Sequence, residues 1–266
     1  MIIYGHRGAR GEAPENTLPG FKAAYSNGIR HFELDILLSG DGIPVVNHDT
    51  TTDRTTGVSG KVGNMTAKAL SELDARKNTT PWSRPCGIPT LQEVFDVCPD
   101  FQHLQLEVKP DQQQRMNILC NRLVELIQRN HWHERVTITS SDSWFLREAK
   151  RRNRHLKTGL VFDKRFPNPV KSAIKLGCDY LCLNSRLCST AVVEAAHKAS
   201  LHVSVWTVNR IHDMLELEKM GVDSIITDYP TSTLMYFDNR PGIAGSRMPK
   251  RVEKDPESIT GTTTTS

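Results

Sequence analysis

Short apolar runs alternate with amphipathic segments along most of this 266-residue chain. Between most of the runs, apolar residues recur at three- and four-residue steps, which predicts helices; the clearest are 114–128 and 211–220. The runs themselves are typical of buried or half-buried strands. The predicted strands are residues 2–6, 31–38, 102–109, 135–140, 157–162, 179–183, 202–208 and 224–228. This alternation of strands and helices places the chain in the α/β class.

Strands separated by single helices pair in parallel through right-handed crossovers. Eight such units are the number that closes a (β/α)8 barrel, the TIM barrel. An open, doubly wound sheet is the alternative arrangement for the same pattern. From the third strand onward the strands follow one another at the spacing that the barrel requires, so we expect the barrel.

The interval between the second and third strands is much longer than the others, which indicates an insertion over residues 39–90. It is rich in Gly, Thr, Asp and Pro, and contains an apolar run at 43–46 and an amphipathic segment at 66–75. Inserted loops on such barrels lie mostly at the functional end. The barrel would therefore cover residues 1–237, and the remaining 238–266, which have almost nothing to bury, are predicted to be a disordered tail.

Composition and charge limit the kinds of ligand and environment that the chain is expected to have. The chain is 38% hydrophobic and 24% charged, with a formal net charge of +4, as in a soluble globular protein. The basic run 150–157 is expected to be the solvated face of a helix rather than a nucleic-acid site, and no apolar run is long enough to insert stably in a membrane. Six cysteines without paired spacing predict neither disulfides nor a zinc site. With no leader ahead of residue 6, these features favour the cytoplasm, while the oligomeric state stays open.

Acidic residues share one face of two neighbouring predicted strands. Side chains alternate across a strand, so Glu33 and Asp35 lie on the same face of the second predicted strand. For the same reason Glu107 and Lys109 share one face of the third predicted strand. Buried acids need cations or a metal. A structural salt-bridge cluster with Lys109 or Arg7 is one interpretation. The other is a divalent metal site, and three carboxylates without cysteine or clustered histidine suit Mg²⁺ or Ca²⁺ better than Zn²⁺.

Two histidines are candidates for proton transfer. His6 ends the first strand and opens the stretch HRGARGEAPENT, residues 6–17, which can also be read as a turn followed by a helix cap at Thr17. His48 begins the loop attached to the acid-bearing strand and can fold over the same barrel mouth. One imidazole could remove a proton from the nucleophile and the other donate one to the leaving oxygen. Arg7 and Lys109 would bind an anion, so the set suits a phosphodiester.

The motifs of this chain, taken in order, resemble those of the glycerophosphodiester phosphodiesterase family. The likeness extends from about residue 2 to 230 and leaves only the tail outside. It depends on seven motifs in register, none of which is specific alone: HRG (6–8), PENT (14–17), ELD (33–35), DG and HD (41–42 and 48–49), EVKP (107–110), WTVN (206–209) and GVDSIITD (221–228).

The resemblance implies a metal-dependent TIM barrel that splits a glycerophosphodiester, a small molecule, into glycerol phosphate and an alcohol. It matches His6 and His48 to the acid and base, Glu33, Asp35 and Glu107 to the metal ligands, and Arg7 and Lys109 to the phosphate-contacting cations. It also implies that Glu15 and Asn16 brace or touch this site, and that Trp206 lines the substrate pocket. Which histidine is the acid, and whether water or the substrate's own hydroxyl attacks, stay open. The alternatives are a lysophospholipase D and a non-catalytic phosphate-binding barrel.

Overall fold

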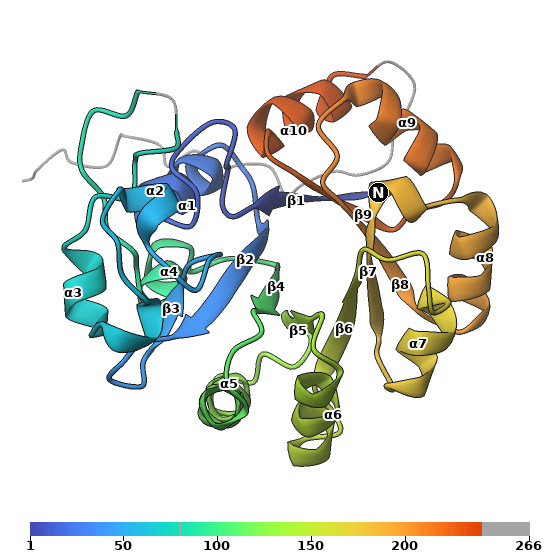
Figure 1. The fold of residues 1–266 in the computed structure, drawn as a ribbon. Coiled ribbons are helices and arrows are strands. Elements are labelled where there is room, and N and C mark those ends of the chain that lie inside the picture. Colours follow the sequence, from blue (N-terminus) through green and yellow to red (C-terminus); the bar gives the residue numbers. More distant parts are fainter. Residues whose placement is uncertain (80, 241–266) are drawn as a thin grey trace, which may run out of the picture.

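A closed parallel barrel forms the centre of the protein (Figure 1). The computed structural model describes residues 1–79 and 81–240, so the predicted tail lies, apart from residues 238–240, outside the described residues. Strand β1 pairs in parallel with both β9 and β2, which closes the sheet in the order β1-β9-β8-β7-β6-β5-β4-β2. This confirms the (β/α)8 barrel and excludes the open sheet. The barrel strands are β1 (Ile2–His6), β2 (His31–Leu38), β4 (His103–Val108), β5 (Val136–Ser140), β6 (Lys157–Phe162), β7 (Tyr180–Asn184), β8 (His202–Trp206) and β9 (Ser224–Thr227).

The helices surround the barrel and present their apolar faces to it (Figure 1). Helix α5 buries Met116, Leu119 and Leu123, the face that the spacing predicts. Thr90 caps α4 in a reciprocal box with Glu93, which satisfies two backbone donors at that helix start. The helices outside the insertion are α1 (Leu18–Ser26), α4 (Leu91–Val97), α5 (Gln113–Arg129), α6 (Ser143–Arg152), α7 (Pro169–Lys175), α8 (Thr190–Lys198), α9 (Ile211–Lys219) and α10 (Pro230–Asp238).

The insertion after β2 forms a small layer with its own apolar cluster. The apolar run at 43–46 becomes β3 (Pro44–Val46), which pairs antiparallel with β2. The amphipathic segment 66–75 is helical over α3 (Ala67–Ser71) alone. Beyond it, Leu73 N donates to Leu70 O and Ala75 N donates to Cys86 O, so neither amide bonds to the carbonyl four residues earlier as a helix requires. A short helix α2 (Asp53–Thr56) lies between them. These pieces position the loop that carries His48.

The end of the barrel where the strands begin is filled by aromatic and imidazole rings. Tyr4 places its hydroxyl 2.9 Å from His103 Nδ1, and Thr137 Oγ1 lies 3.1 Å from His103 Nε2. The Tyr180 ring stacks on His202 with centroids 4.2 Å apart. Because this end is packed, a cavity inside the barrel can open only at the other end, where the strands finish.

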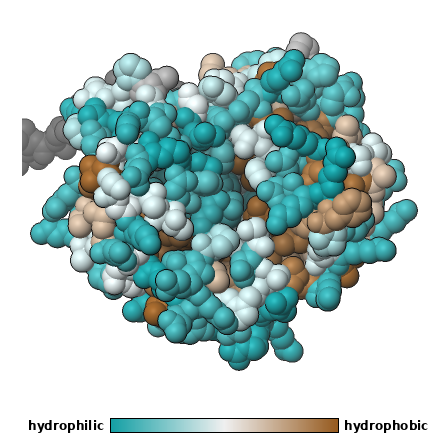
Figure 2. Space-filling model, in the orientation of Figure 1, coloured by the Kyte–Doolittle hydropathy of each residue, from teal (hydrophilic) through white to brown (hydrophobic). Residues whose placement is uncertain are grey.

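Helix length, the state of the cysteines and the course of the basic run complete the description of the fold. Among the described helices none has the length and apolar character needed to cross a membrane. The six cysteines, all within the described residues, are free thiols. The basic run 150–157 is not one helical face, since it ends α6, passes through a turn and begins β6. In Figure 2 most of the visible face is hydrophilic, and hydrophobic residues gather on the side where α7 and α8 lie.

Candidate active site

The loop after β1 has an unusual backbone that aims its side chains into the barrel mouth. Arg7 and Asn16 have φ angles of 52° and 53°, a left-handed conformation that costs a non-glycine residue about 1 kcal/mol. Gly8 follows Arg7 with φ 89°. The turn is held because Asn16 N donates to Arg7 O at 2.9 Å, and Arg7 N donates to Glu33 O at 2.8 Å. Thr17 then caps α1, so the stretch is a turn and cap as well as a carrier of functional groups.

Three carboxylates meet inside the barrel, two of them on β2 and one near the end of β4. Glu33, Asp35 and Glu107 can each place an oxygen so that all three lie within 4.8 Å of one another, because Asp35 pairs in register with Glu107 across the two strands. Lys109 Nζ lies 2.8 Å from Asp35 Oδ1 and 2.6 Å from Glu107 Oε1. Arg7 Nε lies 3.1 Å from Asp35 Oδ2, close enough for an ion pair but not aligned for a hydrogen bond. Two cations therefore face three acids.

The ionisation of this cluster is uneven. Burial, together with the charges of Asp35 and Glu107, raises the pKa of Glu33 well above its usual value, and burial also raises the pKa of Glu107. Burial would raise the pKa of Asp35 too, but Lys109 and Arg7 hold it well below its usual range. The acid cluster is thus short of positive charge around Glu33.

A hard cation fits this shortage. Glu33 Oε1 and Asn16 Oδ1 are buried without a hydrogen-bond partner in residues 1–79 and 81–240. Asn16 Nδ2 donates to Asp35 Oδ2 at 2.8 Å, which fixes the amide beside the acids. Unsatisfied carboxylate and amide oxygens are ligands that Mg²⁺ and Ca²⁺ prefer. The residues present therefore fit a divalent metal, and the donor set suits either ion.

Each candidate histidine has a carboxylate on its Nδ1. His6 Nδ1 lies 2.6 Å from Asp228 Oδ1, while His6 Nε2 lies 3.8 Å from Glu33 Oε2. His48 Nδ1 lies 2.6 Å from Asp49 Oδ1. Such a contact orients the ring and leaves Nε2 for chemistry. Burial lowers the pKa of both imidazoles, against the opposing influence of Asp228 on His6 and of Asp35 on His48.

Glu15 joins the surroundings of both histidines. Its carboxylate, in a residue only 4% exposed, accepts from Arg7 NH1 at 2.8 Å and from Arg54 at 2.7 and 3.0 Å. Arg54 Nε in turn lies 2.5 Å from Asp49 Oδ2, behind His48. Burial alone would raise the pKa of Glu15, but the hydrogen bonds from Arg54 and the charge of Arg7 lower it to about 2. Glu15 also accepts from Arg10 and Asn78.

One cavity of about 270 Å³ is bordered by both candidate histidines, by two of the three acids and by Arg7 and Lys109. Its polar side is supplied by β1, β2, β4 and the insertion, and its apolar side by the strands from β6 to β9. Trp206 lines this cavity and donates from Nε1 to Cys182 O at 3.0 Å. Glu15, Asn16 and Asp35 lie behind the wall rather than on it. The lining residues are His6, Arg7, Arg10, Glu33, His48, Gln105, Glu107, Lys109, Thr139, Val161, Cys182, Trp206, Thr207 and Ile226.

Sequence reasoning missed the groups that hold the histidines. Asp228 and Asn209 lie in the motifs GVDSIITD and WTVN, and Asn209 Nδ2 donates to Asp228 Oδ2 at 2.7 Å. Asp49 lies in the HD motif, and Arg54 lies a few residues further on, in the insertion. The signal that could have found Asp228 is its position: it directly follows β9, at the same end of the barrel as His6.

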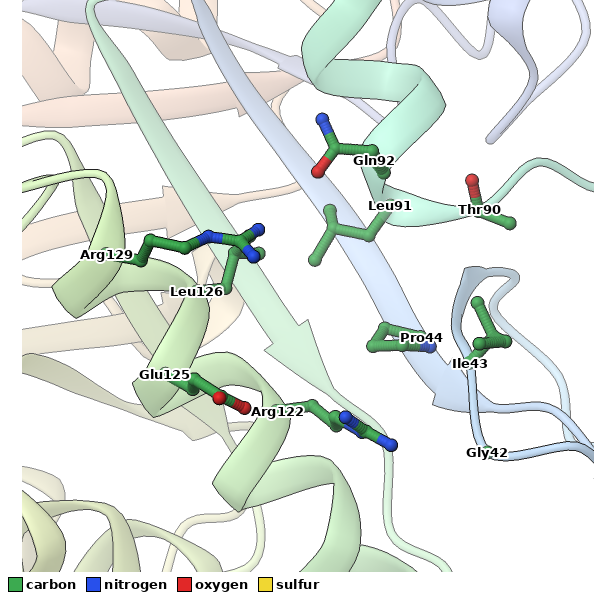
Figure 3. Close-up of a pocket in the computed structure, with 10 residues that line it drawn as sticks. All are labelled: Gly42, Ile43, Pro44, Thr90, Leu91, Gln92, Arg122, Glu125, Leu126 and Arg129. Atoms are coloured by element: carbon green, nitrogen blue, oxygen red, sulfur yellow. The ribbon is translucent and has the colours of Figure 1, made fainter.

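A second cavity, of about 340 Å³, lies outside the barrel between α4, α5 and the start of β3. Figure 3 shows the side chains of α5 on one side of it and those of α4 and residues 42–44 on the other. Within the described chain it contains none of the acid cluster and neither candidate histidine. The chemistry therefore belongs to the cavity in the barrel.

A closed barrel with acids, imidazoles and cations at its carboxyl-terminal mouth defines the class of this protein as a barrel enzyme. The chain belongs to the glycerophosphoryl diester phosphodiesterase family, which residues 6–232 match. This confirms the resemblance that the motifs indicate.

Individual relatives agree over nearly the whole chain. A glycerophosphodiester phosphodiesterase of Caldanaerobacter subterraneus is 34% identical over 234 residues, which are 88% of this chain and 96% of that protein. The structure of an Oleispira antarctica phosphodiesterase in complex with its product sn-glycerol-3-phosphate has a TM-score of 0.79 and 28% identity, covering 90% of this chain and 97% of that one. A glycerophosphodiester phosphodiesterase from Thermotoga maritima has a TM-score of 0.72 and 25% identity, covering 89% and 98%.

Proposed function

We propose that this enzyme hydrolyses small glycerophosphodiesters to glycerol phosphate and an alcohol, with a divalent metal and with His6 and His48 as the proton-transfer pair. The observation that carries the proposal is the single cavity that both imidazoles and two of the acids line, with a carboxylate on each imidazole Nδ1. The product complex of the Oleispira antarctica protein supports glycerol phosphate as the product class.

The metal would be held by Glu33, Asp35 and Glu107, and when bound it polarises the phosphoryl oxygens and orients the nucleophile. Arg7 and Lys109 line the cavity beside these acids. Their cationic groups neutralise the phosphodiester and the charge that develops on its oxygens. Arg7 is preorganised for this task because Glu15 holds one of its terminal nitrogens at 2.8 Å.

The two histidines divide the proton transfers. One Nε2 accepts the proton of the attacking water or substrate hydroxyl, and the other donates a proton to the leaving alkoxide. Asp228 and Asp49 hold the rings by Nδ1 and stabilise the imidazolium form when it arises. A barrel that merely bound phosphate would need the cations but would have no use for two carboxylate-oriented imidazoles at one cavity.

The test is turnover of glycerophosphocholine by protein stripped with EDTA and resupplied with Mg²⁺ or Ca²⁺. We expect His6→Ala and His48→Ala each to abolish turnover while the fold is kept. His197→Ala is the matched control. His197 lies on the outer helix α8, away from the cavity, and its Nε2 also has a carboxylate partner, Asp223, at 2.9 Å. Absence of turnover with both metals would favour the phosphate-binding barrel. A strong preference for lysophosphatidylcholine over glycerophosphocholine would favour the lysophospholipase D.

A further inference from the structure

A bulky aromatic side chain stands in solvent at the mouth end of the barrel. Phe166 is 84% exposed and lies in the loop 163–168 between β6 and α7. The loop follows the carboxyl end of β6, so it belongs to the same end as the catalytic cavity. Its neighbours Lys164 and Arg165 are also exposed. An aromatic ring left in water forgoes the burial that would stabilise it.

The next two loops at the mouth end of the barrel also carry exposed cations. Arg186 is exposed in the turn after β7, and Arg210 is exposed in the loop between β8 and α9. Across the part of the chain that the structure describes, no carboxylate forms an ion pair with Lys164, Arg165, Arg186 or Arg210, so their charges are free to meet an anionic partner; Arg151 and Lys219, by comparison, are paired with glutamates on their own helices. We call these four cations together with Phe166 the basic rim.

The basic rim adjoins the apolar side of the cavity. Val161, Cys182 and Trp206 line that side, and they come from β6, β7 and β8, the three strands whose loops carry the rim. The apolar wall and the rim are therefore successive parts of the same three β-to-loop segments. The polar side, with the acids and histidines, belongs to the opposite half of the mouth.

An exposed aromatic among unpaired cations matches an anionic lipid surface. The ring can enter the headgroup region while the cations stay among the lipid phosphates. Lys and Arg near such a surface each contribute to binding, and salt weakens that contribution. An acidic protein would use the cations but would need a complementary apolar pocket for one isolated ring. We propose that the basic rim docks the barrel mouth on an anionic lipid surface, with Phe166 inserted. The docking does not depend on the proposed activity.

The test is co-sedimentation of the full chain with vesicles of phosphatidylglycerol and phosphatidylcholine in equal parts, and with phosphatidylcholine alone. We expect binding to the anionic vesicles that is lost at high salt. Lys164→Gln/Arg165→Gln should weaken it about 30-fold, and Phe166→Ala about ten-fold. The matched controls are Arg147→Gln/Arg154→Gln, an equal loss of exposed charge away from the rim, and Ile174→Ala, an exposed apolar residue on α7. Both controls should stay within about two-fold of the parent protein.

Several results would overturn the proposal: no binding to anionic vesicles, full binding by Phe166→Ala, or equal losses in the two double variants. Retention on immobilised polyglutamate that Phe166→Ala leaves unchanged, without vesicle binding, would indicate an acidic protein instead. Circular dichroism of every variant reports the fold. Turnover of soluble glycerophosphocholine is measured separately, so a protein that docks without turnover contradicts the proposed function and leaves the docking intact.

Discussion

Replacing Glu15 by glutamine tests whether one buried carboxylate organises both halves of the site. Glutamine keeps the shape but removes the charge that Arg7 and Arg54 contact. The pKa of Glu15 falls from an ordinary 4.5 to about 2 in the folded protein. At 1.36 kcal/mol for each pKa unit, this difference corresponds to about 3 kcal/mol of stability at pH 7. Breaking a buried ion pair by removing one partner costs about 3–5 kcal/mol, which agrees.

The pH dependence has a definite sign. The folded pKa of Glu15 lies below the unfolded one, so its contribution is present above about pH 4.5 and is lost as the pH falls toward 2. Urea denaturation followed by circular dichroism should therefore show Glu15→Gln about 3 kcal/mol less stable at pH 7, and the difference should shrink below pH 5. Activity should fall as well, because Arg7 and Arg54 lose the carboxylate that both contact, and Arg54 in turn contacts Asp49 behind His48.

Glu12→Gln is the matched control, since Glu12 lies in the same loop, is partly exposed and contacts Ser232 at 3.1 Å. It should change stability by less than about 1 kcal/mol. A Glu15→Gln protein as stable as the parent at pH 7, or a difference that does not vary with pH, would refute the reasoning.

Three further predictions concern single groups. Asp228→Asn should lower kcat by about 100-fold or more and shift the pH profile, because it leaves His6 without its charged partner; an unchanged profile would argue against orientation by Asp228. Glu33→Gln should raise the Mg²⁺ concentration that gives half-maximal rate by about 10–100-fold, with partial rescue by excess metal, and isothermal titration with undiminished affinity would remove Glu33 from the ligands. Burial, with His31 and His202 nearby, lowers the pKa of His103 to about 3. Because the unfolded chain then binds more protons below about pH 6.5, His103 costs about 2 kcal/mol at pH 5, and in His103→Gln the urea midpoint should fall less between pH 7 and pH 5.

Much of the fold follows from local pattern. The predicted strands 2–6, 31–38 and 157–162 have the observed bounds, and the others differ by one or two residues at their ends. Alternation along β2 places Glu33 and Asp35 on one face without any knowledge of the tertiary structure. The structure of the insertion is harder to predict from the sequence, because the short helix α3 depends on contacts with the chain around it rather than on its own periodicity.

The candidate site shows the same division. Glu33, Asp35 and Glu107 could be grouped because alternation places them on one face of two neighbouring parallel strands. The partner of His48 is its sequence neighbour Asp49, whereas Asp228 is 222 residues from His6 and comes beside it only when β9 pairs with β1. Glu15 matched a motif, but its role as acceptor for Arg7 and Arg54 depends on how the insertion folds back over the loop.

The pairing of β1 with β2, which we call the seam, places His6 directly opposite Glu33. In the described sheet this seam consists of only two residue pairs, whereas β2 and β4 are joined by six. A brief local opening there would separate the imidazole from the acids without unfolding the rest of the barrel. Amide hydrogen exchange at Arg7, whose N–H bonds to Glu33 O across the seam, would therefore report how often the enzyme passes through a disassembled state.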